Sequence, residues 1–111
     1  MDQVVHVGGL DLDLRQRIKD KLNDAGFTAT GSASSHFAGL DLANICNLCG
    51  RGMGVQLEIS RGLRSQMFLD LTPQGRKHPS KIFYRFVQAV RDAIAPFAEI
   101  FVAAETLEPT D

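Results

Sequence analysis

The sequence predicts an α/β fold of three layers, in which a mostly parallel or mixed sheet packs against helices at about residues 12–25 and 81–95. Three observations support this fold: an apolar run ending in two glycines at residues 4–9, a helical repeat after it, and an alternating pattern at residues 55–59. The 111 residues suffice for one domain with a single core, so we expect residues 1–111 to form one domain.

The first 30 residues have the pattern of a strand, a helix and a second strand. VVHV at residues 4–7 predicts a short buried strand, and Asp11 or Asp13 can cap the helix after it. Gly26 is expected to end that helix, and residues 28–30 then form a strand. Such units build parallel sheets with right-handed crossovers. The helix is defined by apolar residues at Leu14, Ile18, Leu22 and Ala25.

Two glycines, Gly8 and Gly9, precede this helix. Backbone N–H groups at a helix start can hold an anion. The spacing is not that of a dinucleotide or P-loop motif, so a tight turn is the favoured interpretation.

The alternating pattern follows a glycine-rich turn at residues 50–54. Val55, Leu57 and Ile59 alternate with Gln56 and Glu58, which predicts a strand with one apolar and one polar face. A polar face that follows backbone with few side chains can line a cleft.

The C-terminal part begins with a polar loop at residues 72–79 that is basic at its centre. Ser80 can cap the helix at 81–95, whose apolar stripe continues until Pro96. Residues 97–104 are expected to form a final strand or to extend along the surface.

Composition excludes several functional classes. The net charge of −1, with 12 basic and 13 acidic residues, argues against a general nucleic-acid binder, although it leaves room for a local basic cluster. No apolar run approaches the roughly 20 residues of a membrane span, and no charged leader precedes an apolar segment, so we expect a cytoplasmic protein without a membrane partner.

Metal ligands are not assembled by the spacing of the cysteines and histidines. Cys46 and Cys49 form a CxxC without the second ligand pair that zinc needs, and reduced structural cysteines are favoured over a redox pair. His6, His36 and His78 are scattered, and a satisfied or exposed histidine is the favoured interpretation for each. We therefore predict no metal site in this chain alone.

Glu58 is the candidate chemical group, because Arg61 and Arg64 follow its strand. A carboxylate near fixed cations at a strand end suits a general base or an electrostatic anchor. The alternative is a sheet edge with solvated polar residues, where Glu58 pairs with an arginine in a salt bridge worth under ~1 kcal/mol.

The stretch NICNLCGRGMGVQLEISRGLR at residues 44–64 resembles the C-terminal signature of the phage-derived poly-γ-glutamate hydrolases, which have a zinc-carboxypeptidase-like α/β fold. GGLD at residues 8–11, AGF at 25–27 and VRDAI at 90–94 also resemble that family in order and spacing. The resemblance covers residues 4–95 and implies a partial zinc-carboxypeptidase-like domain. It implies a zinc-dependent amidase that cuts γ-glutamyl bonds in an anionic polymer.

The resemblance also implies roles for single residues. Glu58 corresponds to the general base, and Arg61 and Arg64 would contact substrate carboxylates. The family has an Asn-Arg pair that holds a substrate carboxylate. Here Asn47 is followed by leucine, and Arg51 is the candidate substitute for the missing arginine.

The family's zinc ligands belong to a segment before the first strand of this chain. We therefore expect the C-terminal portion of such an enzyme, without zinc bound to it and inactive alone. The alternative function is a non-catalytic remnant or binding module, which uses the glycine-rich cleft to hold an anion or a partner chain. In either case an exposed sheet flank predicts self-association into a homo-oligomer.

Overall fold

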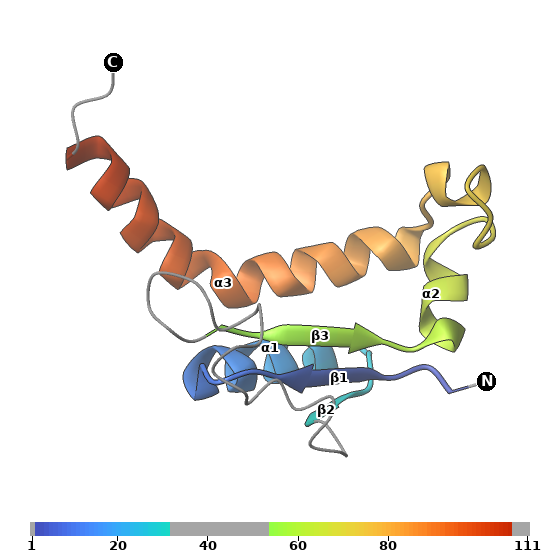
Figure 1. Cartoon of the computed structure of the whole chain (residues 1–111), viewed down its shortest axis with the longest axis horizontal. Coiled ribbons are helices and arrows are strands. Elements are labelled where there is room, and N and C mark those ends of the chain that lie inside the picture. The colour runs from blue at the N-terminus through green and yellow to red at the C-terminus, as the bar shows by residue number, and fades with distance from the viewer. Residues whose placement is uncertain (1, 32–53, 108–111) are drawn as a thin grey trace.

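The computed structural model describes residues 2–31 and 54–107 of the chain (Figure 1). In chain order, its elements are β1 (Val5–Gly8), α1 (Leu12–Asp24), β2 (Ala29–Gly31), β3 (Gln56–Ile59), α2 (Arg61–Met67), the short 3-10 helix η2 (Gly75–Lys77) and α3 (Lys81–Leu107).

The three strands form one mixed sheet in the order β2-β1-β3. β1 and β2 are parallel, with Val5 opposite Ala29, and α1 connects them. β1 and β3 are antiparallel, with Val5 opposite Ile59. The predicted strand-helix-strand unit and the predicted α/β fold with a mixed sheet are therefore confirmed.

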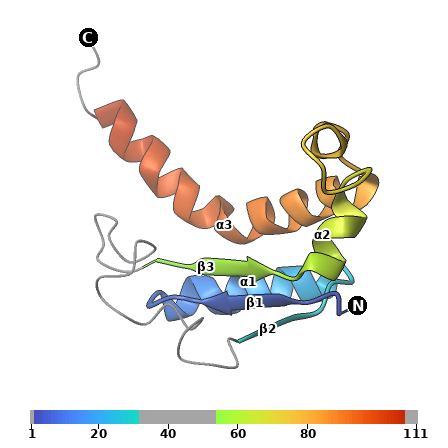
Figure 2. The ribbon, with the colours of Figure 1, turned by 45° about the vertical axis from the view of Figure 1, so that its right-hand side comes forward.

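One hydrophobic core joins the sheet to α1 and α3. Val5 and Val7 point to the same side of β1, and both are fully buried together with Leu22. The two helices also contact each other, and Arg17 Nε donates to the Ala93 carbonyl at 3.0 Å. In the described ranges the helices lie on one face of the sheet, the face that carries Val5 and Val7 (Figure 2). These residues therefore form two of the three predicted layers, the sheet and one layer of helices. The buried core consists of Val5, Val7, Ile18, Leu22, Ala29, Leu63, Met67, Phe86, Ala89 and Ala93.

The ends of α1 follow the expected capping chemistry. The Asp11 carboxylate accepts the Leu14 N–H at 3.1 Å, so Asp11 is the N-cap. Gly26 has φ +94° just after the C-cap Ala25, and the Phe27 N–H returns to the Leu22 carbonyl at 2.9 Å.

The turn at Gly8-Gly9 is filled by other backbone. Gly9 has φ +110°, and a Cβ there would run into the Gly54 carbonyl oxygen. The Asp11 N–H donates to that same oxygen at 3.1 Å. Of the two sequence interpretations, the structure therefore favours the tight turn over an anion site.

The C-terminal helix corrects two expectations. α3 continues through Pro96 to Leu107, so the predicted end at Pro96 is wrong, as are both expectations for residues 97–104, a final strand or a segment extended along the surface. Proline removes one helical hydrogen bond but has a helix-compatible φ, so a helix can continue past it with a bend. The α3 ribbon bends near the middle of its length (Figure 1).

A second helix was not predicted at all. Residues 61–67 form α2, which is short and begins directly after β3.

None of the helices in the described residues combines the length and the apolar character that a membrane span requires.

Candidate functional site

β3 separates polar from apolar side chains as the alternation predicts. Leu57 and Ile59 pack against the core, whereas Glu58 is exposed on the opposite face of the sheet. The Gln56 Nε2 lies 3.5 Å from Glu58 Oε1, at the outer limit of a hydrogen bond. The carboxylate of Glu58 therefore points away from the apolar interior and is accessible.

His6 shares this polar face with Glu58. The β1–β3 register places His6 opposite Glu58, and the β1–β2 register places it opposite Thr30. His6 is half-buried, and among the described residues its Nδ1 is buried without a hydrogen-bond partner. Sequence reasoning expected a satisfied or exposed histidine, and the structure shows neither.

Ser60 fixes the junction between β3 and α2, and it was missed by sequence reasoning. Its Oγ accepts the N–H groups of Val4 at 2.9 Å and Leu63 at 3.3 Å, and it donates to the Asp2 carbonyl at 2.7 Å. Its own N–H donates to the Val4 carbonyl at 2.9 Å. Ser60 thus caps α2 and ties it to β1, two residues after Glu58.

A sequence signal for this cap was present. Ser60 lies three residues before Leu63, and Leu63 and Met67 have the i, i+4 spacing of a helix face and are both buried. That pattern covers only one turn and a half, which is too short for a period to stand out.

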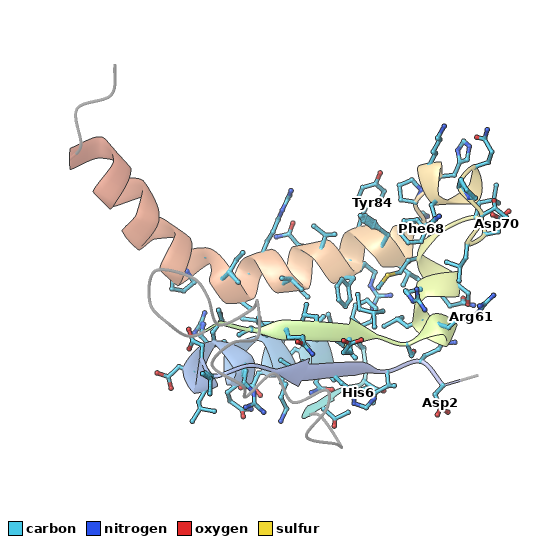
Figure 3. The ribbon with its side chains drawn as sticks, in the orientation of Figure 1. Asp2, His6, Arg61, Phe68, Asp70 and Tyr84 are labelled. Carbon is cyan, nitrogen blue, oxygen red and sulfur yellow. The ribbon has the colours of Figure 1, made fainter. Side chains whose placement is uncertain are left out.

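Arg61 and Arg64 are exposed on α2. Arg61 lies next to the end of β3 (Figure 3). In the described ranges the contact of the Glu58 carboxylate is with Gln56, and neither arginine forms an ion pair with it. The surface salt bridge considered from the sequence is therefore not formed there. Both guanidinium groups remain available to a ligand.

Two predicted substrate-binding residues, Asn47 and Arg51, lie outside the described residues. The same holds for Cys46, Cys49 and His36. Of the predicted site, the structure therefore places Glu58, Arg61 and Arg64, on β3 and the helix that follows it.

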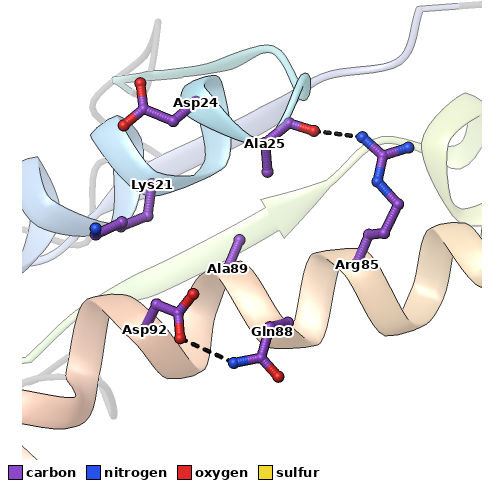
Figure 4. A pocket seen from close by; sticks show the side chains of 7 residues that line it. All are labelled: Lys21, Asp24, Ala25, Arg85, Gln88, Ala89 and Asp92. Atoms are coloured by element: carbon purple, nitrogen blue, oxygen red, sulfur yellow. Dashed lines mark hydrogen bonds between the residues drawn. The ribbon is translucent and has the colours of Figure 1, made fainter.

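A groove of about 490 Å³ lies between α1 and α3 (Figure 4). Three of its polar side chains form hydrogen bonds: Gln88 donates to Asp92 at 2.8 Å, and Arg85 donates to the Ala25 carbonyl. A second hollow of about 190 Å³ lies beside Phe27 and Ile82. Neither hollow includes Glu58, so the cleft predicted at that residue is not formed by these two. The first groove is lined by Lys21, Asp24, Ala25, Arg85, Gln88, Ala89 and Asp92.

The described residues do not fit a zinc site. In residues 2–31 and 54–107, no group of three His, Cys, Asp or Glu side chains is placed to hold a metal ion. His6 and Glu58 face the same side of the sheet, but two such residues are fewer than the three or four protein ligands that zinc takes.

Solved structures share this fold. A bacteriophage poly-gamma-glutamate hydrolase matches with a TM-score of 0.82 and 34% identity, over 89% of this chain and 48% of that chain. The zinc-free structure of YndL matches with a TM-score of 0.78 and 29% identity, over 85% of this chain and 48% of that chain. This chain therefore spans about half the length of either solved protein.

Relatives from Bacillus subtilis (strain 168) agree. The SPbeta prophage-derived UPF0714 protein YoqZ is 40% identical over 83 residues, which are 73% of this chain and 30% of the relative. The UPF0714 protein YmaC is 37% identical over 90 residues, or 79% of this chain and 38% of that protein. The family model described as poly-gamma-glutamate hydrolase matches residues 1–89. The chain belongs to the poly-gamma-glutamate hydrolase family.

Proposed function

We propose that the chain acts as the C-terminal portion of a zinc-dependent poly-γ-glutamate hydrolase-like amidase and supplies its general base, Glu58. The observation that carries this proposal is the exposed carboxylate of Glu58 on the polar face of β3, two residues before the Ser60 cap. The family match over residues 1–89 supports the reaction class.

In this proposal, Glu58 takes a proton from the attacking water and delivers it to the leaving nitrogen of the γ-glutamyl amide. Its exposure and its position beside Gln56 leave it open to solvent and substrate. Arg61 and Arg64 bind substrate carboxylates, because a guanidinium group can donate two parallel hydrogen bonds to a carboxylate. Asn47 and Arg51 are proposed to bind substrate as well.

We also propose that the chain is inactive alone and does not bind zinc by itself. The described residues present no metal-ligand cluster. The chain also spans 48% of the bacteriophage hydrolase, so metal ligands can come from the other half of such an enzyme. We propose a cytoplasmic setting, as expected from the sequence.

The test combines this chain with the N-terminal half of the bacteriophage hydrolase and measures γ-glutamyl hydrolysis in the presence of zinc. The reconstituted pair should turn over substrate, and neither half alone should do so. Glu58→Gln should lower turnover by about 10²–10⁴-fold, as expected for loss of a general base, without changing assembly measured by size-exclusion chromatography.

The matched control is Asp92→Asn, which removes an exposed carboxylate on α3 and should leave turnover unchanged. Full turnover by the Glu58→Gln pair would remove Glu58 from the mechanism. Stoichiometric zinc in the purified chain alone would contradict the proposed absence of a metal site.

The second candidate function is a non-catalytic module that binds an anion or a partner chain and self-associates. It is favoured by two exposed large side chains: Leu69, in the loop after α2, is 73% exposed, and Tyr84, on α3, is 62% exposed. The ring centroid of Phe83 lies 5.4 Å from that of Phe68 and 5.3 Å from that of Tyr84. Sedimentation of Leu69→Ser/Tyr84→Ser against the unmodified chain tests it, since a module of this kind predicts oligomers that the variant loses.

A further inference from the structure

Charge is unevenly distributed along this chain. Residues 59–91 contain seven Lys or Arg and a single acidic residue, Asp70, which gives this segment a net charge of +6. The whole chain has a net charge of −1, so the remaining residues carry −7. The basic loop noted in the sequence is therefore part of a larger basic segment.

The fold gathers five of these cations at one end of the molecule. α2, η2 and the start of α3 lie together beyond the C-terminal end of β3 (Figure 1). We call the exposed residues there the cationic end. The cationic end consists of Arg61, Arg64, Arg76, Lys77 and Lys81.

The loop that carries η2 is held against both helices. The Leu69 N–H donates to the His78 carbonyl at 3.0 Å, and Phe68 pairs with Pro79 in an antiparallel bridge. The Ser80 N–H donates to the Met67 carbonyl at 2.7 Å. Backbone bonds therefore fix the base of this loop to the end of α2 and the start of α3.

The single acid of the segment does not neutralise these cations by contact. The Asp70 carboxylate accepts the Thr72 N–H at 2.9 Å and the Thr72 hydroxyl, and the Gly75 N–H donates to that hydroxyl at 3.0 Å. Among residues 2–31 and 54–107, the cationic end forms no ion pair or side-chain hydrogen bond. Five cations thus face solvent without a protein partner in the described ranges.

Two of these cations lie at helix N-termini, where a positive charge is unfavourable for helix stability. Arg61 and Lys81 are the first residues of α2 and α3, and neither helix has an acidic residue in its first turn. The helix dipole favours acidic side chains at this end and disfavours basic ones. Helix stability therefore does not account for cations at these two positions.

We propose that Arg76, Lys77 and Lys81 of the cationic end bind the anionic polymer substrate beyond the carboxylates assigned to Arg61 and Arg64, and this inference rests on the proposed function. Arg61 lies three residues after Glu58, and the seven residues of α2 span about 10 Å. In Figure 1, α2 lies between the end of β3 and the η2 loop, so a substrate that contacts both Glu58 and this loop must extend at least past α2.

The distribution of charge along the chain favours binding of a polycarboxylate at the cationic end. The −7 carried by the remaining residues disfavours a polyanion elsewhere on the molecule, and the cationic end attracts it. A general nucleic-acid binder needs a basic excess over the whole domain, which this chain lacks.

The test measures binding of fluorescein-labelled poly-γ-glutamate to the 111-residue chain by fluorescence anisotropy at several salt concentrations. Arg76→Gln/Lys77→Gln should bind about threefold to tenfold more weakly at low salt, with a shallower salt dependence, because two screened ionic contacts are lost. Lys81→Gln is a second variant that relieves the unfavourable charge at the start of α3, so it should stay folded and still bind more weakly.

The matched control is Lys19→Gln/Lys21→Gln on α1, which removes the same number of positive charges far in sequence from the cationic end. This variant should bind poly-γ-glutamate within about twofold of the unmodified chain. Equal binding by the loop variant, or an equal loss in the control, would overturn the proposal. Tighter binding of oligodeoxythymidylate than of poly-γ-glutamate of equal charge would also overturn it and would indicate a nucleic-acid surface. These outcomes are separate from hydrolysis by the reconstituted pair, which tests Glu58.

Discussion

The Gly54 carbonyl oxygen stands where a Cβ on Gly9 would lie. Gly9 ends the turn after β1, and Gly54 precedes β3, so this approach joins two segments that are distant in sequence. The Asp11 N–H donates to the same oxygen at 3.1 Å and fixes the approach to the start of α1. This contact holds the first residues of β3, the strand that carries Glu58, beside β1.

Gly9→Ala should lower the free energy of unfolding by about 2–4 kcal/mol, because the methyl group is strained at φ +110° and displaces the backbone of residues 54–55. Urea denaturation measures this loss. Gly31→Ala is the control, because among the described residues its Cβ would meet Arg15 Nη2 at 3.9 Å, an ordinary contact. This substitution should change stability by under about 1 kcal/mol. Equal effects of the two substitutions would contradict the proposed packing.

Ser60→Ala should destabilise the chain by about 2 kcal/mol, because it removes the α2 cap and leaves the Val4 N–H without its side-chain acceptor. Amide hydrogen exchange should show the loss of protection concentrated in α2 and the start of β1. Ser65 is an exposed residue of α2 whose hydroxyl donates to the Gly62 carbonyl, so Ser65→Ala should change stability by no more than about 0.5 kcal/mol. Undiminished protection of α2 in Ser60→Ala would count against the cap.

Arg85→Lys should lower the free energy of unfolding by about 1 kcal/mol. The Arg85 guanidinium donates to the Ala25 carbonyl and lies 5.6 Å from the centroid of the Phe27 ring, and lysine cannot make both contacts from one planar group. Thermal unfolding followed by circular dichroism measures the change. Arg91→Lys on the same helix is the control, because Arg91 is exposed and should tolerate the change.

Asp70 provides a prediction about pH. Hydrogen bonds from the Thr72 hydroxyl and then the Thr72 N–H hold the pKa of Asp70 below its ordinary value of 3.8, with a smaller contribution from His78, while desolvation opposes them. The folded state therefore binds a proton on Asp70 less readily than the unfolded state. Its stabilising contribution is present above pH 3.8 and is lost as pH falls through the lowered pKa.

Carboxyl NMR titration measures this pKa directly. Thr72→Val removes the hydroxyl donor and should move the pKa of Asp70 upward, toward 3.8. Thr28→Val, a threonine outside this loop, should leave the Asp70 titration unchanged. An Asp70 pKa that Thr72→Val does not raise would contradict the assignment of its cause.

Local patterns were sufficient for the first half of the described fold. The helical repeat of Leu14, Ile18 and Leu22 predicted α1, and the capping roles of Asp11 and Gly26 follow from chemistry within one turn. The alternation around Glu58 predicted both β3 and its polar face. Periodicity works here because each element is long enough, or regular enough, for one face to be apolar.

The errors arose where local patterns compete with packing. Pro96 reads as a helix end, but α3 continues past it with a bend. α2 is too short to show a period, and the hydrogen bond that ties its cap residue Ser60 to Val4 joins positions 56 apart in the sequence. The candidate site shows the same division, since the sequence predicted roles for Glu58, Arg61 and Arg64, which stay predictions, and did not predict the contacts of Ser60.

The amino-acid sequence alone determined the strand-helix-strand unit, the acidic side chain on a polar strand face and the excess of positive charge after it. These properties follow from the order of side chains along one segment. The tertiary structure alone decided that β3 pairs antiparallel with β1, that His6 lies opposite Glu58, and that the cations of α2, η2 and α3 gather at one end. Such relationships join residues far apart in the chain, and only folding brings them into register, because burial of a shared core selects one arrangement among many locally acceptable ones.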